Sequence, residues 1–300
     1  MLCLGIGGGG DVVGALASAE LVRGQGTPAL VGGVTWERQA IDPRPGPRRL
    51  DELVEAERLN GAAALAGPRT ATADGLRFAE SRVAGVLGEP TLLIDPWPGP
   101  AAVGAALADA AARLDFDLAI MIDVGGDALA RGDEPGLASP LCDAILLAAA
   151  EPLAAAGVTV LAGVFGAGCD GELTVGEVLE RVAEVAAAGA LLGAWGLTPP
   201  AVQRLEEAVA AVPTEASAQA LACARGARGT AEIRGGRRTV ERTPVGALTF
   251  YFDAPAALAA AAPLARAVRG AGDLEEANRC LHELGVRTEL DLEREKPPAA

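Results

Sequence analysis

The sequence predicts an α/β protein of three layers, with a mainly parallel, open, Rossmann-like sheet, helices on both faces and a more helical C-terminal part. Short apolar runs alternate with longer helix-like segments, which is typical of a parallel sheet joined by crossover helices. Several of these runs are apolar without interruption, as expected for strands covered on both faces. Half of the 300 residues are hydrophobic but only 3% are aromatic. Much of that fraction is alanine, which favours alanine-rich helices on aliphatic strands over an all-β sandwich.

The expected elements follow one another in a regular order. The strands are predicted at LCLGI (2–6), PALVGGVTW (28–36), TLLIDPW (91–97), DLAIMIDVGG (117–126) and VTVLAGVFG (158–166). The helices between them are predicted at residues 11–23, 101–114, 139–156 and 174–189. Residues 1–190 are therefore expected to form the α/β core that binds a ligand.

Two parts of the chain depart from this alternation of strands and helices. Residues 37–90 are polar, glycine-punctuated and rich in proline at 42–49, and predict a long excursion folded over the ligand edge of the sheet. Residues 191–292 predict helices at 199–211, 214–225, 254–268 and 273–285 around one strand, ALTFYFD (247–253), with a segment near 230–242 as its candidate partner. This half is expected either to complete the same domain or to cap it. Residues 293–300 are expected to be a disordered tail.

The charge of the chain limits its partners. The net charge of −15 argues against nucleic acid, whose phosphates need a concentrated basic surface. The densest basic run, RGARGTAEIRGGRR (225–238), is interpreted as a solvated loop or hairpin in preference to an anion-binding patch. No signal peptide and no membrane span are expected, since no apolar run is long enough. The five cysteines are odd in number, widely spaced and without a CxxC pair, which indicates reduced thiols in a cytoplasmic protein.

A glycine-rich turn, GIGGGGDVVG (5–14), follows the first strand. Gly5, Gly7 and Gly10 fit the G-x-G-x-x-G pattern between a strand and a helix, where backbone amides can receive a phosphate group. An NAD site fits less well, because no acidic residue ends the second strand at the usual distance and Asp11 would repel a pyrophosphate. The competing interpretation makes Asp11 a helix N-cap and the glycines only a sharp turn.

Acidic residues also follow glycines at the ends of two later strands. Asp123 ends the strand at 117–126, and Asp127 follows Gly125 and Gly126. Carboxylates four residues apart across such a turn can converge on one hard cation. The competing interpretation is that Asp127 caps and solvates a helix start. Ser139 is expected to be the N-cap of the next helix, with Pro140 at its first position and Asp143 in its first turn. Asp143 is left open between a ligand and a helix-start role.

The third strand end, FGAGCDGELTVGE (165–177), repeats the pattern. A Thr-x-x-Glu capping box accounts for 174–177, but Asp170 and Glu172 have no such explanation. At the end of the second strand, Trp36 is a candidate for stacking on a ligand, although a core position is the commoner role. The single histidine, His282, has no nucleophile motif near it, which makes a Ser-His-Asp mechanism improbable.

Taken together, the segments GIGGGGDVVGA, GGVTWER with DPRPGPR, IDVGGDALARGDEPGLASPLCDA and FGAGCDGEL, in this order, resemble the family known as domain of unknown function 1152. The resemblance spans roughly residues 2–255. It implies a shared architecture and a shared site at these motifs, and it implies no particular reaction.

The functional expectation is a Mg²⁺-dependent enzyme, of phosphoryl- or nucleotidyl-transferase or hydrolase type, acting on a phosphorylated or nucleotide-like small molecule. Asp123 with Asp127 or Asp170 would hold the cation, and Asp11 would be a further ligand or a general base. The residues expected to bind the ligand are Gly7, Gly8, Gly9, Gly10, Trp36, Glu37, Arg38, Gly125, Gly126, Ser139, Gly168 and Glu172. The alternatives are a non-catalytic ligand-binding or regulatory module and, third, an NAD(P)-dependent oxidoreductase. The expected partner is an anionic small molecule, with no nucleic acid and no membrane, and a homo-oligomer is left open.

Overall fold

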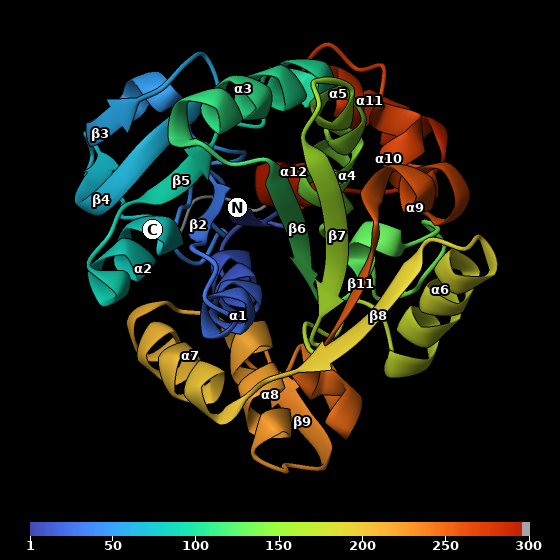
Figure 1. Ribbon diagram of the computed structural model, residues 1–300. Helices are drawn as coiled ribbons and strands as arrows, with labels where there is room; N and C mark the ends of the chain where they lie inside the picture. Colours follow the sequence, from blue (N-terminus) through green and yellow to red (C-terminus); the bar gives the residue numbers. More distant parts are fainter. Residues whose placement is uncertain (296–300) are drawn as a thin grey trace.

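Five parallel strands form the centre of a nine-stranded sheet in the computed structural model, which describes residues 1–295 (Figure 1). The strand order is β3-β4-β5-β2-β1-β6-β7-β11-β8. The parallel strands are β1 (Leu2–Gly5), β2 (Leu30–Val34), β5 (Thr91–Ile94), β6 (Leu118–Val124) and β7 (Thr159–Phe165). The chain adds β2 and β5 on one side of β1 and then β6 and β7 on the other. The order therefore reverses between β1 and β6, where open sheets of this kind bind ligands.

Antiparallel strands extend the sheet at both ends. Beyond β5 lie β4 (Ala63–Thr72) and β3 (Leu53–Arg58). Beyond β7 lie β11 (Leu248–Asp253) and β8 (Leu191–Gly196). The Rossmann-like, mainly parallel prediction is thus confirmed for the centre of the sheet.

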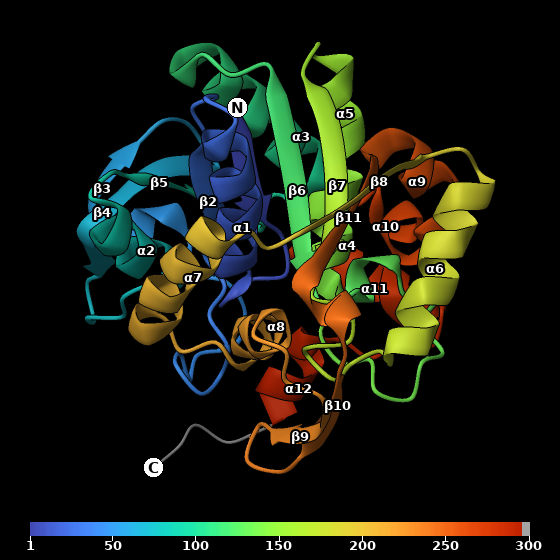
Figure 2. The ribbon, with the colours of Figure 1, turned by 60° about the horizontal axis from the view of Figure 1, so that its bottom comes forward.

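Helices cover both faces of the sheet. One face carries α1 (Asp11–Gly24), α2 (Ala79–Leu87), α7 (Pro199–Ala211) and α8 (Glu215–Ala224), of which α1 and α7 lie in front of the strands in Figure 2. The other face carries α3 (Gly99–Leu114), α4 (Pro140–Ala148), α5 (Ala150–Ala155), α9 (Ala254–Ala261), α10 (Pro263–Val268) and α11 (Leu274–Glu283). Helix α6 (Val175–Ala187) packs against α9 and β8, and α12 (Glu289–Glu295) contacts α4.

Strand β1 shows why the sheet has two apolar cores. Leu2 and Leu4 belong to the core beneath α3 and α4, whereas Cys3 belongs to the core beneath α1. Successive side chains of a strand point to opposite faces, so a central strand must be apolar at every position. All three side chains are fully buried.

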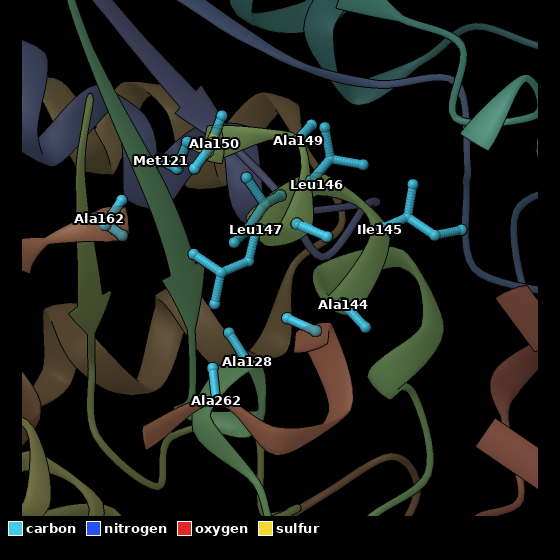
Figure 3. Packing of buried hydrophobic residues seen from close by; sticks show 14 of the residues in the cluster. Met121, Ala128, Ala144, Ile145, Leu146, Leu147, Ala149, Ala150, Ala162 and Ala262 are labelled. Carbon is cyan, nitrogen blue, oxygen red and sulfur yellow. The ribbon is translucent and has the colours of Figure 1, made fainter. Parts of the chain in front are cut away.

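Helix α4 is buried on every side. Each of its nine residues is buried, and Figure 3 shows the helix beside β6, with Leu147 on the side of that strand and of Met121. A helix that is apolar all round belongs in the interior of a protein. Its position is therefore fixed by close packing, which matters for the site because Asp143 lies in its first turn.

The structure corrects three expectations. Residues 37–90 are not one excursion over the ligand edge: β3, β4 and α2 extend the sheet, and only the beginning of this segment reaches the cavity described below. Strand β11 does not pair with residues 230–242. It lies between β7 and β8, where Phe252 is buried, and β9 (Gly229–Ile233) pairs with β10 (Arg238–Arg242) in a separate hairpin.

The third correction concerns the C-terminal end. The disordered tail predicted for 293–300 is wrong for residues 293–295, which belong to α12. Glu293 is buried and accepts hydrogen bonds, which accounts for the order of this turn. Residues 296–300 lie outside the described part of the chain.

Short one-turn 3₁₀ helices lie at Leu50–Glu52, Asp127–Leu129 and Pro244–Ala247. Among residues 1–295, no helix combines the length and apolar character needed to cross a membrane. All five cysteines are free thiols.

Helix α1 provides a test of the packing on the sheet. A Cβ atom at Gly14 would lie 2.3 Å from Val124 Cγ2 and 3.1 Å from Phe165 Cδ1, so α1 approaches β6 and β7 only because this position is glycine. We expect Gly14→Ala to lower the free energy of unfolding by about 1–3 kcal/mol, measured by urea denaturation.

The matched control is Gly24→Ala at the end of the same helix, where a Cβ atom would meet nothing within 4 Å. This variant should be neutral or more stable, by up to ~1 kcal/mol, because alanine favours a helix. Equal effects of the two substitutions would contradict the close approach of α1.

Candidate functional site

A cavity of about 870 Å³ lies at the carboxyl ends of the central strands. The loops after β1, β2, β6 and β7 and the first turn of α4 all contribute to its lining. The glycines and polar residues of these segments that line it are Gly8, Gly10, Asp11, Arg38, Gln39, Asp127, Ser139, Asp143, Asp170 and Glu172. The segments expected to form a site are thus brought together at the switch point of the sheet.

The glycine loop encloses a carboxylate of its own chain. Gly7 N–H donates to Asp11 Oδ2 at 3.0 Å, and Gly9 N–H donates to Trp36 O at 2.8 Å. Asp11 Oδ2 also accepts from Val124 N–H at 3.3 Å, which ties α1 to the end of β6. Two of the amides expected to receive a phosphate are therefore engaged within the protein. The N-cap interpretation of Asp11 is wrong as well, because Gly10 is the N-cap of α1 and Asp11 is its first residue.

Three carboxylates converge beside this loop, and we call them the inner cluster: Asp11, Asp123 and Asp143. Each offers an oxygen within 4.8 Å of those of the other two, and all three side chains are buried. Asp123 Oδ2 accepts from Ala128 N–H at 3.1 Å. Among the described residues, Asp123 Oδ1 and Asp143 Oδ1 have no hydrogen-bond partner. Buried polar atoms without partners are rare and call for an explanation.

Burial raises the pKa values of the three carboxyl groups of the inner cluster. Desolvation, with the neighbouring Asp123 carboxylate, raises the pKa of Asp11 to about 7, against the lowering effect of Arg38. Desolvation also raises the pKa of Asp123 to about 6. The pKa of Asp143 lies well above its ordinary value because of burial and of the charges on Asp123 and Asp11. Without a cation, the inner cluster therefore retains protons near neutral pH.

A second group of carboxylates, Asp127, Asp170 and Glu172, lies in the same cavity and is called the outer cluster. The negative charge of Glu172 is compensated by its partners. The carboxylate accepts hydrogen bonds from Arg238 Nη1 at 2.9 Å and from the amide of Ser139 at 2.8 Å. Although burial opposes this, Arg238 and the Ser139 hydroxyl hold the pKa of Glu172 below its ordinary value. Burial and neighbouring carboxylates raise the pKa of Asp127 and of Asp170 well above the ordinary value.

The three residues expected from the sequence to bind one cation lie in different clusters. Asp123 groups with Asp11 and Asp143, whereas Asp127 and Asp170 group with Glu172. Ser139 is the N-cap residue of α4, as predicted, but its hydroxyl donates to Glu172 and makes no cap hydrogen bond to the helix.

Arg38 lies between the clusters and partly offsets their charge. Its Nη2 donates to Gly7 O at 2.9 Å, and its side chain lies over Gly9. Although burial opposes protonation, the carboxylates of Asp11, Glu172 and Glu289 raise the pKa of Arg38.

Five of the predicted ligand-binding residues are structural. Trp36 is 2% exposed in the core, and its Nε1 donates to Glu293 Oε2 at 3.1 Å. Glu37 is buried and accepts from the first amide of α2. The other three are glycines where a Cβ atom would collide with a neighbouring segment: Gly125 with Asp170, Gly126 with Val178, and Gly168 with the backbone of Val175. They allow the loops to pack closely and do not line the cavity.

The sequence analysis did not predict that residues of the C-terminal third of the chain line the cavity. Glu289 of α12 lines the cavity and accepts from the amides of Leu141 and Cys142 in the first turn of α4. The basic run interpreted as solvated places Arg234, Arg237 and Arg238 on the cavity. Glu289 has no motif around it, but the density of arginines at 225–238 was a usable signal.

The fold and cavity define a doubly wound α/β protein with a carboxylate-rich site at its switch point. A family model described as "Protein of unknown function (DUF1152)" matches residues 2–297, and the chain belongs to this family. The resemblance noted in the motifs is thereby confirmed, over a longer part of the chain. Comparisons with curated proteins and with solved structures found no match.

The inner cluster predicts an unusual effect of removing a buried carboxyl. Asp143→Asn removes the free-energy cost of burying this acid, and its amide can donate to Asp11 or Asp123. We expect the metal-free protein to gain about 1 kcal/mol, a rise of roughly 2 °C in Tm.

The control is Asp133→Asn, an exposed acid on the loop before α4, which should leave Tm unchanged. A clear fall in Tm for Asp143→Asn, in thermal unfolding with EDTA, would show that this carboxylate is a required structural acceptor.

The raised pKa values also predict how stability depends on pH. The pKa of Asp11 is about 7 in the folded protein and near 3.8 in the unfolded chain, so the unfolded chain loses its proton first as pH rises. The metal-free protein should therefore become less stable between pH 4 and 7, by ~1 kcal/mol per pH unit for this group. Thermal unfolding in EDTA at a series of pH values checks this. A Tm that rises steadily from pH 5 to pH 8 would contradict it.

Proposed function

We propose that this protein is a Mg²⁺-dependent enzyme that acts on a phosphorylated or nucleotide-like small molecule. The observation that carries the proposal is the inner cluster, where two buried carboxylate oxygens lack partners within residues 1–295, beside a cavity large enough for such a ligand. Like-charged carboxylates this close are stable only if they share protons or bind a cation.

The donor set fits magnesium. Mg²⁺ prefers carboxylate oxygens together with water and phosphate oxygens, in a site that leaves several positions to the substrate. Asp11, Asp123 and Asp143 would hold the ion, with the two unpartnered oxygens as natural ligands. A bound Mg²⁺ would neutralise charge on phosphoryl oxygens of the substrate.

The chain's own residues have distinct parts in this proposal. The glycine loop positions Asp11, since a Cβ atom on Gly7 would lie 2.6 Å from Asp11 Oδ2 and 2.8 Å from Asp143 Oδ2. Asp127 faces the cavity, and burial with the neighbouring carboxylates raises its pKa well above the ordinary value, a direction of shift that suits a general acid. The same loop argues against the oxidoreductase alternative, because the Asp11 carboxylate occupies the inside of the turn where a dinucleotide pyrophosphate would bind.

The test compares Asp123→Asn with the unchanged protein. Isothermal titration with MgCl₂ should show binding to the unchanged protein and at least a tenfold loss in Asp123→Asn. Thermal shifts with ATP, ADP and glucose 6-phosphate should be larger with Mg²⁺ than in EDTA, and this Mg²⁺-dependent part should vanish in the variant. The metal-free variant should keep or slightly gain stability, because one repelling charge is removed.

The exposed Asp133→Asn variant should behave as the unchanged protein in every assay. A destabilised Asp123→Asn protein that binds MgCl₂ and the nucleotides as before would reduce Asp123 to scaffolding. Shifts with NAD that are independent of metal would favour the oxidoreductase.

A further inference from the structure

The β9–β10 hairpin carries three arginines that line the same cavity as carboxylates of the inner and outer clusters. The hairpin lies beside α8 (Figure 2), and Arg234, Arg237 and Arg238 of its turn and second strand line the cavity. We propose that Arg234, supported by Arg237, binds a terminal phosphate group of the substrate opposite the inner cluster. This assignment deepens the proposed function and rests on it for the cation.

The backbone of the hairpin turn is specialised. Arg234, Gly235 and Gly236 have φ values of 56°, 65° and 80°, so three successive residues are left-handed. Glycine adopts this conformation freely, whereas an arginine there is strained. The N–H of Arg234 donates to Glu215 Oε2 at 2.9 Å, which fixes the turn on the first residue of α8. Strain of this kind at a residue that lines a cavity is typical of a functional position.

The guanidinium groups near this turn differ in the hydrogen bonds that they donate to the protein. Arg38 and Arg238 already donate to the protein, to Gly7 O and to Glu172 respectively. Arg234 comes only within 3.8 Å of Glu215 through Nε, and within residues 1–295 its guanidinium makes no hydrogen bond. Burial and the like charges of Arg38 and Arg238 lower the pKa of Arg234. Positive groups that repel one another around one volume favour an anion between them.

The chemistry of the cavity selects the class of anion. A phosphate group offers three oxygens, which a cation on the inner cluster and the guanidinium groups on the hairpin can share. A carboxylate has only two oxygens in one plane, so it has fewer oxygens to share between the cation and the guanidinium groups. Apolar residues, among them Ile41, Val209, Val212 and Leu292, also line the cavity and provide contacts for an organic portion. The ligand is therefore an organic phosphate ester or anhydride.

The experiment measures binding of inorganic pyrophosphate to the full chain by isothermal titration at low salt, first in EDTA and then with MgCl₂. We expect Arg234→Ala to weaken binding at least tenfold in both conditions and Arg234→Lys to restore it only in part. The matched control, Arg228→Ala, removes an exposed arginine just before β9 and outside the cavity lining, and should bind as the unchanged protein. Malonate, a dianion with planar carboxylates, should bind much more weakly than pyrophosphate.

The outcomes separate this inference from the proposed function. If MgCl₂ adds nothing but Arg234→Ala still loses metal-free binding, the arginine site stands and the cation proposal fails. If Asp123→Asn loses MgCl₂ binding but Arg234→Ala binds pyrophosphate unchanged, the cation site stands and this inference is overturned. It is also overturned if Arg228→Ala and Arg234→Ala lose binding equally, if malonate binds as well as pyrophosphate, or if pyrophosphate binds in neither condition.

Discussion

The mutual repulsion of the buried carboxylates Asp11, Asp123 and Asp143 is the constraint around which the rest of the site is arranged. At 4–5 Å in an effective dielectric of about 20, each ionised pair costs roughly 3–4 kcal/mol. Holding the pKa of Asp11 at about 7 instead of 3.8 costs ~4 kcal/mol at neutral pH, a similar amount. Keeping Asp11 protonated at neutral pH therefore costs about as much as the repulsion between ionised carboxylates. A bound divalent cation would remove both costs.

Close packing keeps the carboxylates from moving apart. Asp143 lies on a helix that is buried at every residue, and Asp123 lies at the end of a central strand. Asp11 is held by amides of the glycine loop and of β6. Because interiors are packed as densely as crystals, no single side chain can relax without displacing its neighbours. The arrangement is therefore preorganised, with Glu172 and Glu289 stabilising the N-terminal end of α4 through its amides.

The parts of this structure that the sequence predicted are those governed by local pattern. Continuous apolar runs predicted the parallel strands, and acids after glycines predicted the loops that meet at the cavity. Strand β8 was missed because LLGAWG is short, interrupted by glycine and exposed at the edge of the sheet, with Trp195 half-exposed. The grouping of the carboxylates could not be predicted, since it depends on the angle at which α4 meets β6. Trp36 and Glu37 looked like ligand residues because their partners, Glu293 and the first amide of α2, are distant in sequence.

Helix α12 has a consequence for how the protein is made. Its Glu289 reaches the start of α4 and its Glu293 reaches Trp36 and Gly46, so the cavity joins residues from both ends of the chain. During translation, these two glutamates leave the ribosome about 280 residues after the glycine loop and Asp11. Until then the acidic loops lack contacts that fix them, and contacts so distant in sequence form slowly. Most strands of the sheet can therefore form before α12 is synthesised, but the site is complete only when α12 has folded against α4.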